Sequence, residues 1–235
     1  MDDVTPELLA NVEKSFNEMI KNDSKIAKIL KRISDGGNYD DANAFAQRYG
    51  ELLSRALKLN ISGDDLPDGK MYFNIAQKLL NPLLDGDYNA VADICETVQT
   101  TLNKSAGIGL KAIRPELNKD RIKGFLDRIS NEPLFDEVAW IFGEPIVNFS
   151  QSVVDDSVKA NADFQYKTGL NPQVVRTAER KCCKWCQSLE GIYTYPNVPR
   201  EVFQRHEACR CNVTYDGSNL KAYTNRRGAN NTFRA

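Results

Sequence analysis

Histidine is almost absent from the sequence, because His206 is the only one among 235 residues. A Ser-His-Asp triad must therefore use His206, and a two-histidine or histidine-rich metal centre is excluded. Long apolar runs are also lacking, and none approaches the roughly 18–20 residues that span a bilayer. The first residues are acidic and contain no apolar stretch, so we expect no secretory signal, no membrane partner and synthesis in a cytosol.

The composition excludes a wholly disordered or collagen-like chain, since 41% of residues are hydrophobic and 27% are charged. The net charge of −1 hides an asymmetry. Residues 1–163 carry 19 Lys and Arg against 27 Asp and Glu, whereas residues 164–235 carry 12 against 5. We therefore expect an acidic body and a basic C-terminal part that have different partners.

Apolar residues recur at helical spacing through the first 160 residues, with Thr5 as the expected N-cap of the first helix. The predicted helices span residues 6–33, 42–59, 71–84, 88–102, 118–129, 132–141 and 147–164, with Asp85-Gly86-Asp87 separating two of them. After Gly169 the pattern predicts strands at 173–178, 191–195 and 211–215 and a short helix at 199–205.

These elements predict an α+β fold that is mainly α, in three parts. Residues 1–168 form a helical, acidic body, and residues 169–215 form a small Cys/His zinc module with short strands. Residues 216–235 are rich in Asn, Gly and Arg and are expected to be a basic tail, either extended or disordered.

Cysteine is concentrated near the C-terminus, where five of the six cysteines lie within 30 residues of one another and His206 lies among them. A Cys-x-x-Cys knuckle is followed about 20 residues later by a His-x-x-Cys-x-Cys segment. Zinc prefers such a tetrahedral mixture of thiolate and imidazole ligands. The candidate ligands are Cys183, Cys186 and His206, with Cys209 or Cys211 as the fourth; the sequence does not distinguish these two. Four protein ligands make a closed, structural site.

Other interpretations of the cluster are reduced cysteines, a disulfide pair, a catalytic cysteine or a metal-dependent nuclease. His206 lies near Cys209, and Arg210 could lower a thiol pKa. A nucleophile is nevertheless unusual inside a ligand cluster, and a nuclease needs an open coordination position. We therefore expect no enzymatic activity. The alternative is a nucleic-acid-processing enzyme or toxin-like protein. Cys182 adjoins Cys183 and is expected to point away from the site.

Basic side chains surround the cluster and continue into the C-terminal tail. The candidates for contact with nucleic acid or a protein partner are Arg210, Lys221, Arg226 and Arg227. Such a density of positive charge suits phosphate or an acidic protein surface. It equally suits solubility, or self-association through the acidic body of a neighbouring copy.

Residues 176–215 resemble the signature region of the phage Mu F-like family of head-morphogenesis, or minor head, proteins. The shared features are an Arg-Thr pair, a Cys-x-x-Cys, a Leu-x-Gly and a His-x-x-Cys-x-Cys before a short strand. This chain supplies them as Arg176-Thr177, Cys183 with Cys186, Leu189-Glu190-Gly191, and His206 with Cys209 and Cys211. It has Glu207 where the family often has proline.

The resemblance implies a minor head structural protein of a tailed phage or prophage. Such a protein docks at the portal or at the inner surface of the major capsid protein and is able to contact packaged DNA. The implied location is the virion head, after assembly in the host cytoplasm. Some relatives carry a toxin domain after this region, and since about 20 residues follow Tyr215 we expect none in this chain.

Overall fold

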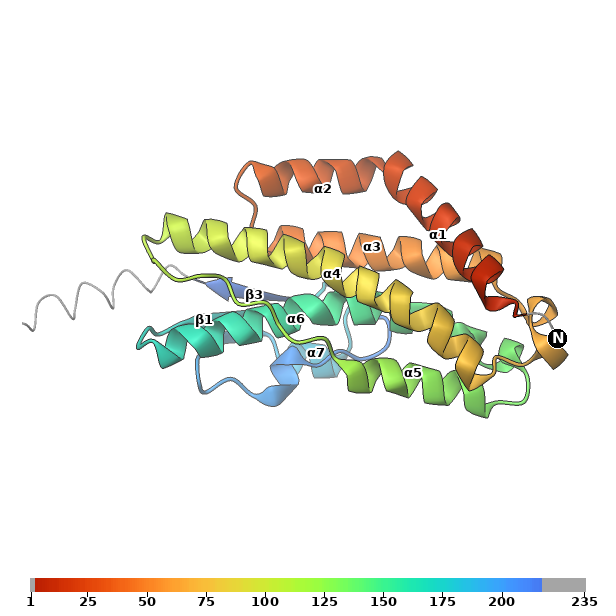
Figure 1. Cartoon of the computed structure of the whole chain (residues 1–235). Coiled ribbons are helices and arrows are strands. Elements are labelled where there is room, and N and C mark those ends of the chain that lie inside the picture. Colours follow the sequence, from red (N-terminus) through yellow and green to blue (C-terminus); the bar gives the residue numbers. More distant parts are fainter. Residues whose placement is uncertain (1–2, 217–235) are drawn as a thin grey trace, which may run out of the picture.

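The computed structural model describes residues 3–216 and is mainly helical, with a small antiparallel sheet near the C-terminus (Figure 1). The predicted α+β, mainly α fold class is therefore confirmed. The long helices are α1 (Thr5–Asn22), α2 (Ser24–Ser34), α3 (Tyr39–Asn60), α4 (Phe73–Ser105), α5 (Lys119–Asn131) and α6 (Glu144–Lys167). None of the helices in residues 3–216 combines the length and apolarity needed to cross a membrane.

Helix α6 is the centre of the bundle, because it packs against α3 on one side and α4 on another. Helices α1 and α2 cover the outer side of α3 and α4, and α5 lies beside α4 (Figure 1). Short 3-10 helices connect the long ones; they are η1 (Gly63–Asp65), η2 (Pro67–Gly69), η3 (Phe135–Glu137) and η4 (Ala139–Phe142). The predicted helix over residues 132–141 is therefore wrong, since this stretch turns twice to bury Phe135 and Phe142.

The first predicted helix is divided in two at Asp23. The backbone of Asp23 is extended, and its carboxylate accepts hydrogen bonds from the N–H groups of Lys25 and Ile26 at 3.0 and 2.8 Å. This side chain caps α2 and ends α1 without interrupting the apolar periodicity. The expected cap at Thr5 is wrong, because Thr5 is already helical and buried.

Helix α4 runs unbroken where the sequence predicts two helices. It passes through Pro82 and Gly86, and apolar side chains on both sides of that stretch are buried. A glycine inside a helix costs only about 1 kcal/mol relative to alanine, which the packing of this long apolar face outweighs. Asp87, expected in a turn, instead lies inside the bundle with 1% exposure.

The C-terminal part comprises β1 (Gln173–Thr177), α7 (Lys184–Ser188), β2 (Gly191–Thr194), η5 (Arg200–Phe203) and β3 (Asn212–Asp216). The strands form an antiparallel sheet in the order β2-β1-β3, with Val174 opposite Tyr193 and Tyr215. The three predicted strands are confirmed. Val174, Val213 and Tyr215 join the same hydrophobic core as the helices, because β3 packs on α3 and α6.

A buried hydrogen-bonded network also ties the sheet to the helices. The Tyr215 hydroxyl donates to the Gln165 side chain, whose amide nitrogen donates to Asn103 at 3.0 Å. Gln99 donates to the same Asn103 oxygen at 2.8 Å and accepts from the Tyr39 hydroxyl at 2.9 Å. Satisfied buried networks of this kind specify one packing arrangement. The sheet therefore has a defined position on the bundle.

Candidate metal centre

The Cys-x-x-Cys knuckle lies at the start of α7. Cys183 has an extended backbone and precedes the helix, whereas Cys186 lies within it and is fully buried. The backbone N–H groups of Cys186 and Trp185 face the Cys183 thiol and lower its pKa. The turn therefore brings the two sulfurs to one side and favours the thiolate form of Cys183.

The second group of donors lies on the loop between η5 and β3. Ala208 has a φ of 54°, a left-handed conformation that reverses the chain between His206 and Cys209. The Cys209 N–H accordingly donates to the His206 carbonyl at 3.3 Å. Cys209 and Cys211 are both 1% exposed. The turn thus points His206 and Cys209 toward α7.

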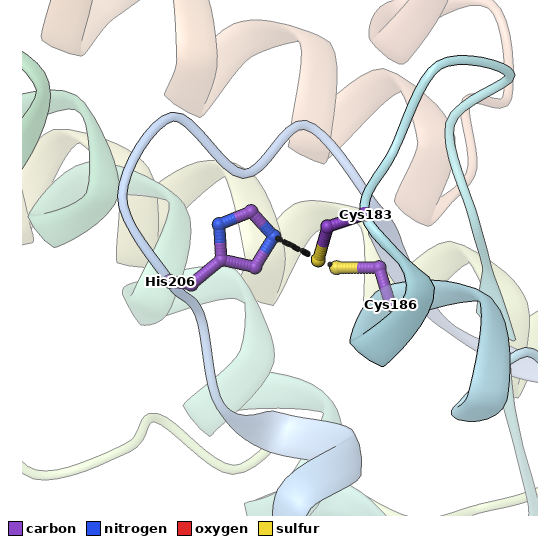
Figure 2. A group of neighbouring side chains, drawn as sticks. All are labelled: Cys183, Cys186 and His206. Carbon is purple, nitrogen blue, oxygen red and sulfur yellow. Dashed lines mark hydrogen bonds between the residues drawn. The ribbon is translucent and has the colours of Figure 1, made fainter.

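The predicted ligand residues converge in space. His206 Nε2 lies 3.4 Å from Cys183 Sγ and 3.0 Å from Cys186 Sγ. Figure 2 shows the imidazole facing these two sulfurs. Cys186 Sγ lies 3.7 Å from Cys209 Sγ. Tetrahedral zinc, with bonds of about 2.3 Å to sulfur and about 2.0 Å to nitrogen, separates two sulfurs by roughly 3.8 Å and sulfur from nitrogen by roughly 3.5 Å. The donor atoms are thus spaced closely enough to share a metal ion.

The donor atoms fall into two overlapping groups. One contains Cys183, Cys186 and His206, and the other contains Cys186, Cys209 and Cys211. Within each group all ligand atoms lie within 4.8 Å of one another. Cys186 is common to both groups. The structure therefore forms a Cys/His cluster with the chemistry of a metal site.

The imidazole of His206 is oriented by its own backbone neighbour. Nδ1 lies 2.6 Å from the Glu207 carbonyl oxygen, so its proton is donated there. The Nε2 lone pair is then left facing the sulfurs, as it is in histidines that bind metal. The edge of the Trp185 ring packs on the imidazole at a centroid distance of 5.8 Å. Together these contacts hold the ring in the orientation of a ligand.

Arg176 contacts the cluster, which the sequence reasoning missed, since the residue entered only through the Arg-Thr pair of the resemblance and as one of the basic side chains. It lies on β1 with 1% exposure, and its Nη2 is 3.8 Å from the sulfurs of both Cys186 and Cys209. Its Nη1 donates to the carbonyls of Val202 and Gln204. Burial raises the pKa of the Cys186 thiol, and the guanidinium opposes this effect. The signal in the sequence was the alternation that places Arg176, like Val174, on the buried face of the strand.

Helix α6 anchors the His206 loop. Arg205 forms a buried ion pair with Asp155, at 2.5 and 2.8 Å, and also donates to the Cys211 carbonyl at 2.8 Å. Asn148 donates to the His206 carbonyl at 2.9 Å. In the amide orientation that gives both its nitrogen and its oxygen a partner, Gln151 donates to the Cys209 carbonyl at 3.0 Å and accepts from Arg205. These polar residues recur at helical spacing on α6, a pattern that could have been detected from the sequence.

The expectation that Cys182 points away from the site is wrong. Cys182 packs against the cluster formed by Cys186, Cys209 and Cys211. The reason is a turn in which the Cys182 N–H donates to the Glu179 carbonyl at 3.0 Å. In a turn, adjacent side chains need not alternate as they do in a strand.

Of the residues predicted to contact nucleic acid or a partner, only Arg210 lies in the described part of the chain. Arg210 donates to the Glu144 carboxylate at 3.0 Å, so its charge is paired within the chain. Lys221, Arg226, Arg227 and the predicted tail beyond Asp216 lie outside the described residues. Two surface cavities are lined by residues other than those of the Cys/His cluster. One of about 500 Å³ lies between α4 and α5, and one of about 620 Å³ lies between residues 115–118 and α6.

Comparison of the chain with protein-family models, with curated proteins and with solved structures finds no match in any of the three.

Proposed function

We propose that Cys183, Cys186, His206 and Cys209 bind a zinc ion that holds the C-terminal part of the chain together. The observation that carries the proposal is the convergence of donors from α7 and from the His206 loop, with Nε2 facing two sulfurs at 3.4 and 3.0 Å. Of the two candidates for the fourth place, Cys209 has the sulfur separation from Cys186 that a tetrahedral ion requires. Cys211 instead accepts the Glu179 backbone N–H at 3.5 Å.

The role of this zinc would be structural, because protein side chains fill all four places and leave none for water or substrate. The segment from Ala178 to Cys211 contains one short α-helix and buries few large apolar side chains. Metal binding would therefore supply much of its folding free energy. Arg176 and the Glu207 carbonyl would contact the ligands from outside the metal site. Arg176 would favour the thiolate form of the cysteines, and the carbonyl would orient the His206 ring.

We further propose that the protein is a phage minor head structural protein, as the motif resemblance implies. The residues that carry the resemblance include Arg176 and the cysteines and histidine, and these occupy one place in the fold. The acidic helical body offers a large surface for docking to the portal or the major capsid protein. Any contact with packaged DNA would involve the basic C-terminal part.

The zinc proposal is tested with the substitution His206→Ala. We expect the variant to lose the metal and to exchange amide hydrogens faster in residues 178–211, while α3, α4 and α6 keep their protection. Cys95→Ala is the matched control, because Cys95 is buried in α4 and should leave the zinc content unchanged. A folded His206→Ala protein that keeps its zinc and loses a nucleic-acid-processing activity would instead favour the enzyme alternative.

The minor head proposal is tested by quantitative mass spectrometry of purified particles from the native source, with tail-only fractions as control. We expect the chain to accompany full heads in a few to tens of copies. Its absence from particles at every stage of assembly would overturn the proposal and leave the zinc site unaffected.

A further inference from the structure

The cluster contains more donors than one tetrahedral ion can use. Five cysteines and one histidine lie together, and the proposed zinc ion uses four of them. Of the two that are left, Cys211 is one of the buried cysteines and Cys182 packs against them. Two further thiols beside the proposed ion require an explanation.

The donors form two groups around a shared centre. Cys183 and His206 share one group with Cys186 (Figure 2), and Cys209 and Cys211 share the other group with it. Cys182 adjoins the second group. Cys186 and Cys209, with 0% and 1% exposure, are 3.7 Å apart at the junction. This separation is close to that of two thiolates that bridge a pair of metal ions, because both sulfurs then belong to both tetrahedra.

We propose that the cluster holds two zinc ions that share the thiolates of Cys186 and Cys209. One ion takes Cys183 and His206 as its other ligands, and the second takes Cys182 and Cys211. The inference rests on the zinc site proposed above and extends it. Six donors, two of them used twice, supply eight bonds, which is the number that two tetrahedral ions require.

The charges around the cluster agree with two ions. Two zinc ions carry four positive charges against the five negative charges of the thiolate ligands. A single negative charge is left. The Arg176 guanidinium, buried and 3.8 Å from each of the shared sulfurs, supplies one positive charge. The cluster would then be close to neutral.

The test is the number of zinc ions bound by the full chain, loaded with zinc and desalted, measured by native mass spectrometry and elemental analysis. We expect two per chain, and one per chain in Cys211→Ser and in Cys182→Ser. Cys182 is only half-buried, so its variant keeps the test informative if Cys211→Ser fails to fold. Cys95→Ala is the control and should retain two ions.

Cobalt(II) titration tests whether the thiolates are shared. Two cobalt ions joined by bridging thiolates couple magnetically, so the paramagnetic signal should rise with the first equivalent and fall with the second. One zinc ion per chain, with Cys182 and Cys211 open to alkylation, would overturn this inference and leave the proposed function intact. No bound zinc would overturn both, and two ions without magnetic coupling would overturn the sharing.

Discussion

Asp87 is a carboxyl group inside the bundle, where it accepts a hydrogen bond from the Ser150 hydroxyl at 2.8 Å and its second oxygen has no partner. Burial raises its pKa from 3.8 to about 7, although the Ser150 bond opposes this. The pKa of Asp87 is higher in the folded than in the unfolded protein, so the free energy of unfolding is largest below about pH 4, where the carboxyl is neutral in both states. It falls as the pH rises toward about 7, because the unfolded state then loses its proton more readily than the folded state.

Asp87→Asn should remove this dependence on pH. We expect the variant to have nearly the same free energy of unfolding as the native protein near pH 4. Near pH 8 it should be more stable by about 2–4 kcal/mol, because it has no charge to bury. Urea unfolding at the two pH values measures the difference, and a difference that does not change with pH would contradict the prediction.

Asp155 and Arg205 form an ion pair with side chains 0% and 1% exposed. Asp155→Ala leaves the buried guanidinium without its counter-charge, so we expect a loss of about 3–5 kcal/mol in the free energy of unfolding. Lys123→Ala is the control, because it removes an exposed pair with Asp127 and should cost less than about 1 kcal/mol. Equal losses in the two variants, measured by denaturant unfolding, would show that burial is not what matters.

At the scale of elements, Gly86 lies on an open face of its helix, whereas Gly50 lies where its helix packs closely on another. A Cβ at Gly86 in α4 would meet nothing within 4 Å, so Gly86→Ala should stabilise the protein by about 0.5–1 kcal/mol. A Cβ at Gly50 in α3 would lie 2.5 Å from Ser150 Oγ and 2.9 Å from the Val147 Cα of α6. Gly50→Ala should therefore destabilise by about 1–3 kcal/mol. Thermal unfolding of both variants checks the opposite signs, and a destabilising Gly86→Ala would argue against a continuous α4.

For the molecule as a whole, metal removal should separate the stability of the C-terminal segment from that of the bundle. A chelator should lower the unfolding temperature, and zinc a thousandfold above its Kd should restore about 4 kcal/mol. Helical circular dichroism should change little, because the long helices contribute no ligands. A complete loss of helicity on chelation would mean instead that the bundle itself depends on the metal.

The C-terminal part and the bundle share one core, which determines how far unfolding would extend after metal removal. Val174, Val213 and Tyr215 pack with the helices, while the cysteines form a smaller cluster of their own. Asn43 on α3 donates to the Val213 carbonyl at 3.0 Å. The strands are therefore held by the bundle and the His206 loop by α6, whereas α7 depends on contacts around the cluster.

The sequence by itself determined the fold class, the strands and the identity of the clustered donors. Helical and alternating periodicities follow from local geometry. Within each group of donors the spacing is short enough for a tight turn to bring the ligand atoms together, which is how Cys183, Cys186, His206, Cys209 and Cys211 could be identified. The opposite net charges of the helical body and the C-terminal part could also be counted directly from the sequence.

Only the tertiary structure decided the features that depend on residues far apart in the chain. Burial against α6 keeps α4 continuous through Gly86, although glycine locally predicts a break. A side-chain cap at Asp23 divides α1 from α2 without a change in periodicity. The contacts of Arg176 and Cys182 with the other cysteines arise because β1, α7 and the His206 loop meet at one place, and no local pattern of residues predicts which distant segments meet.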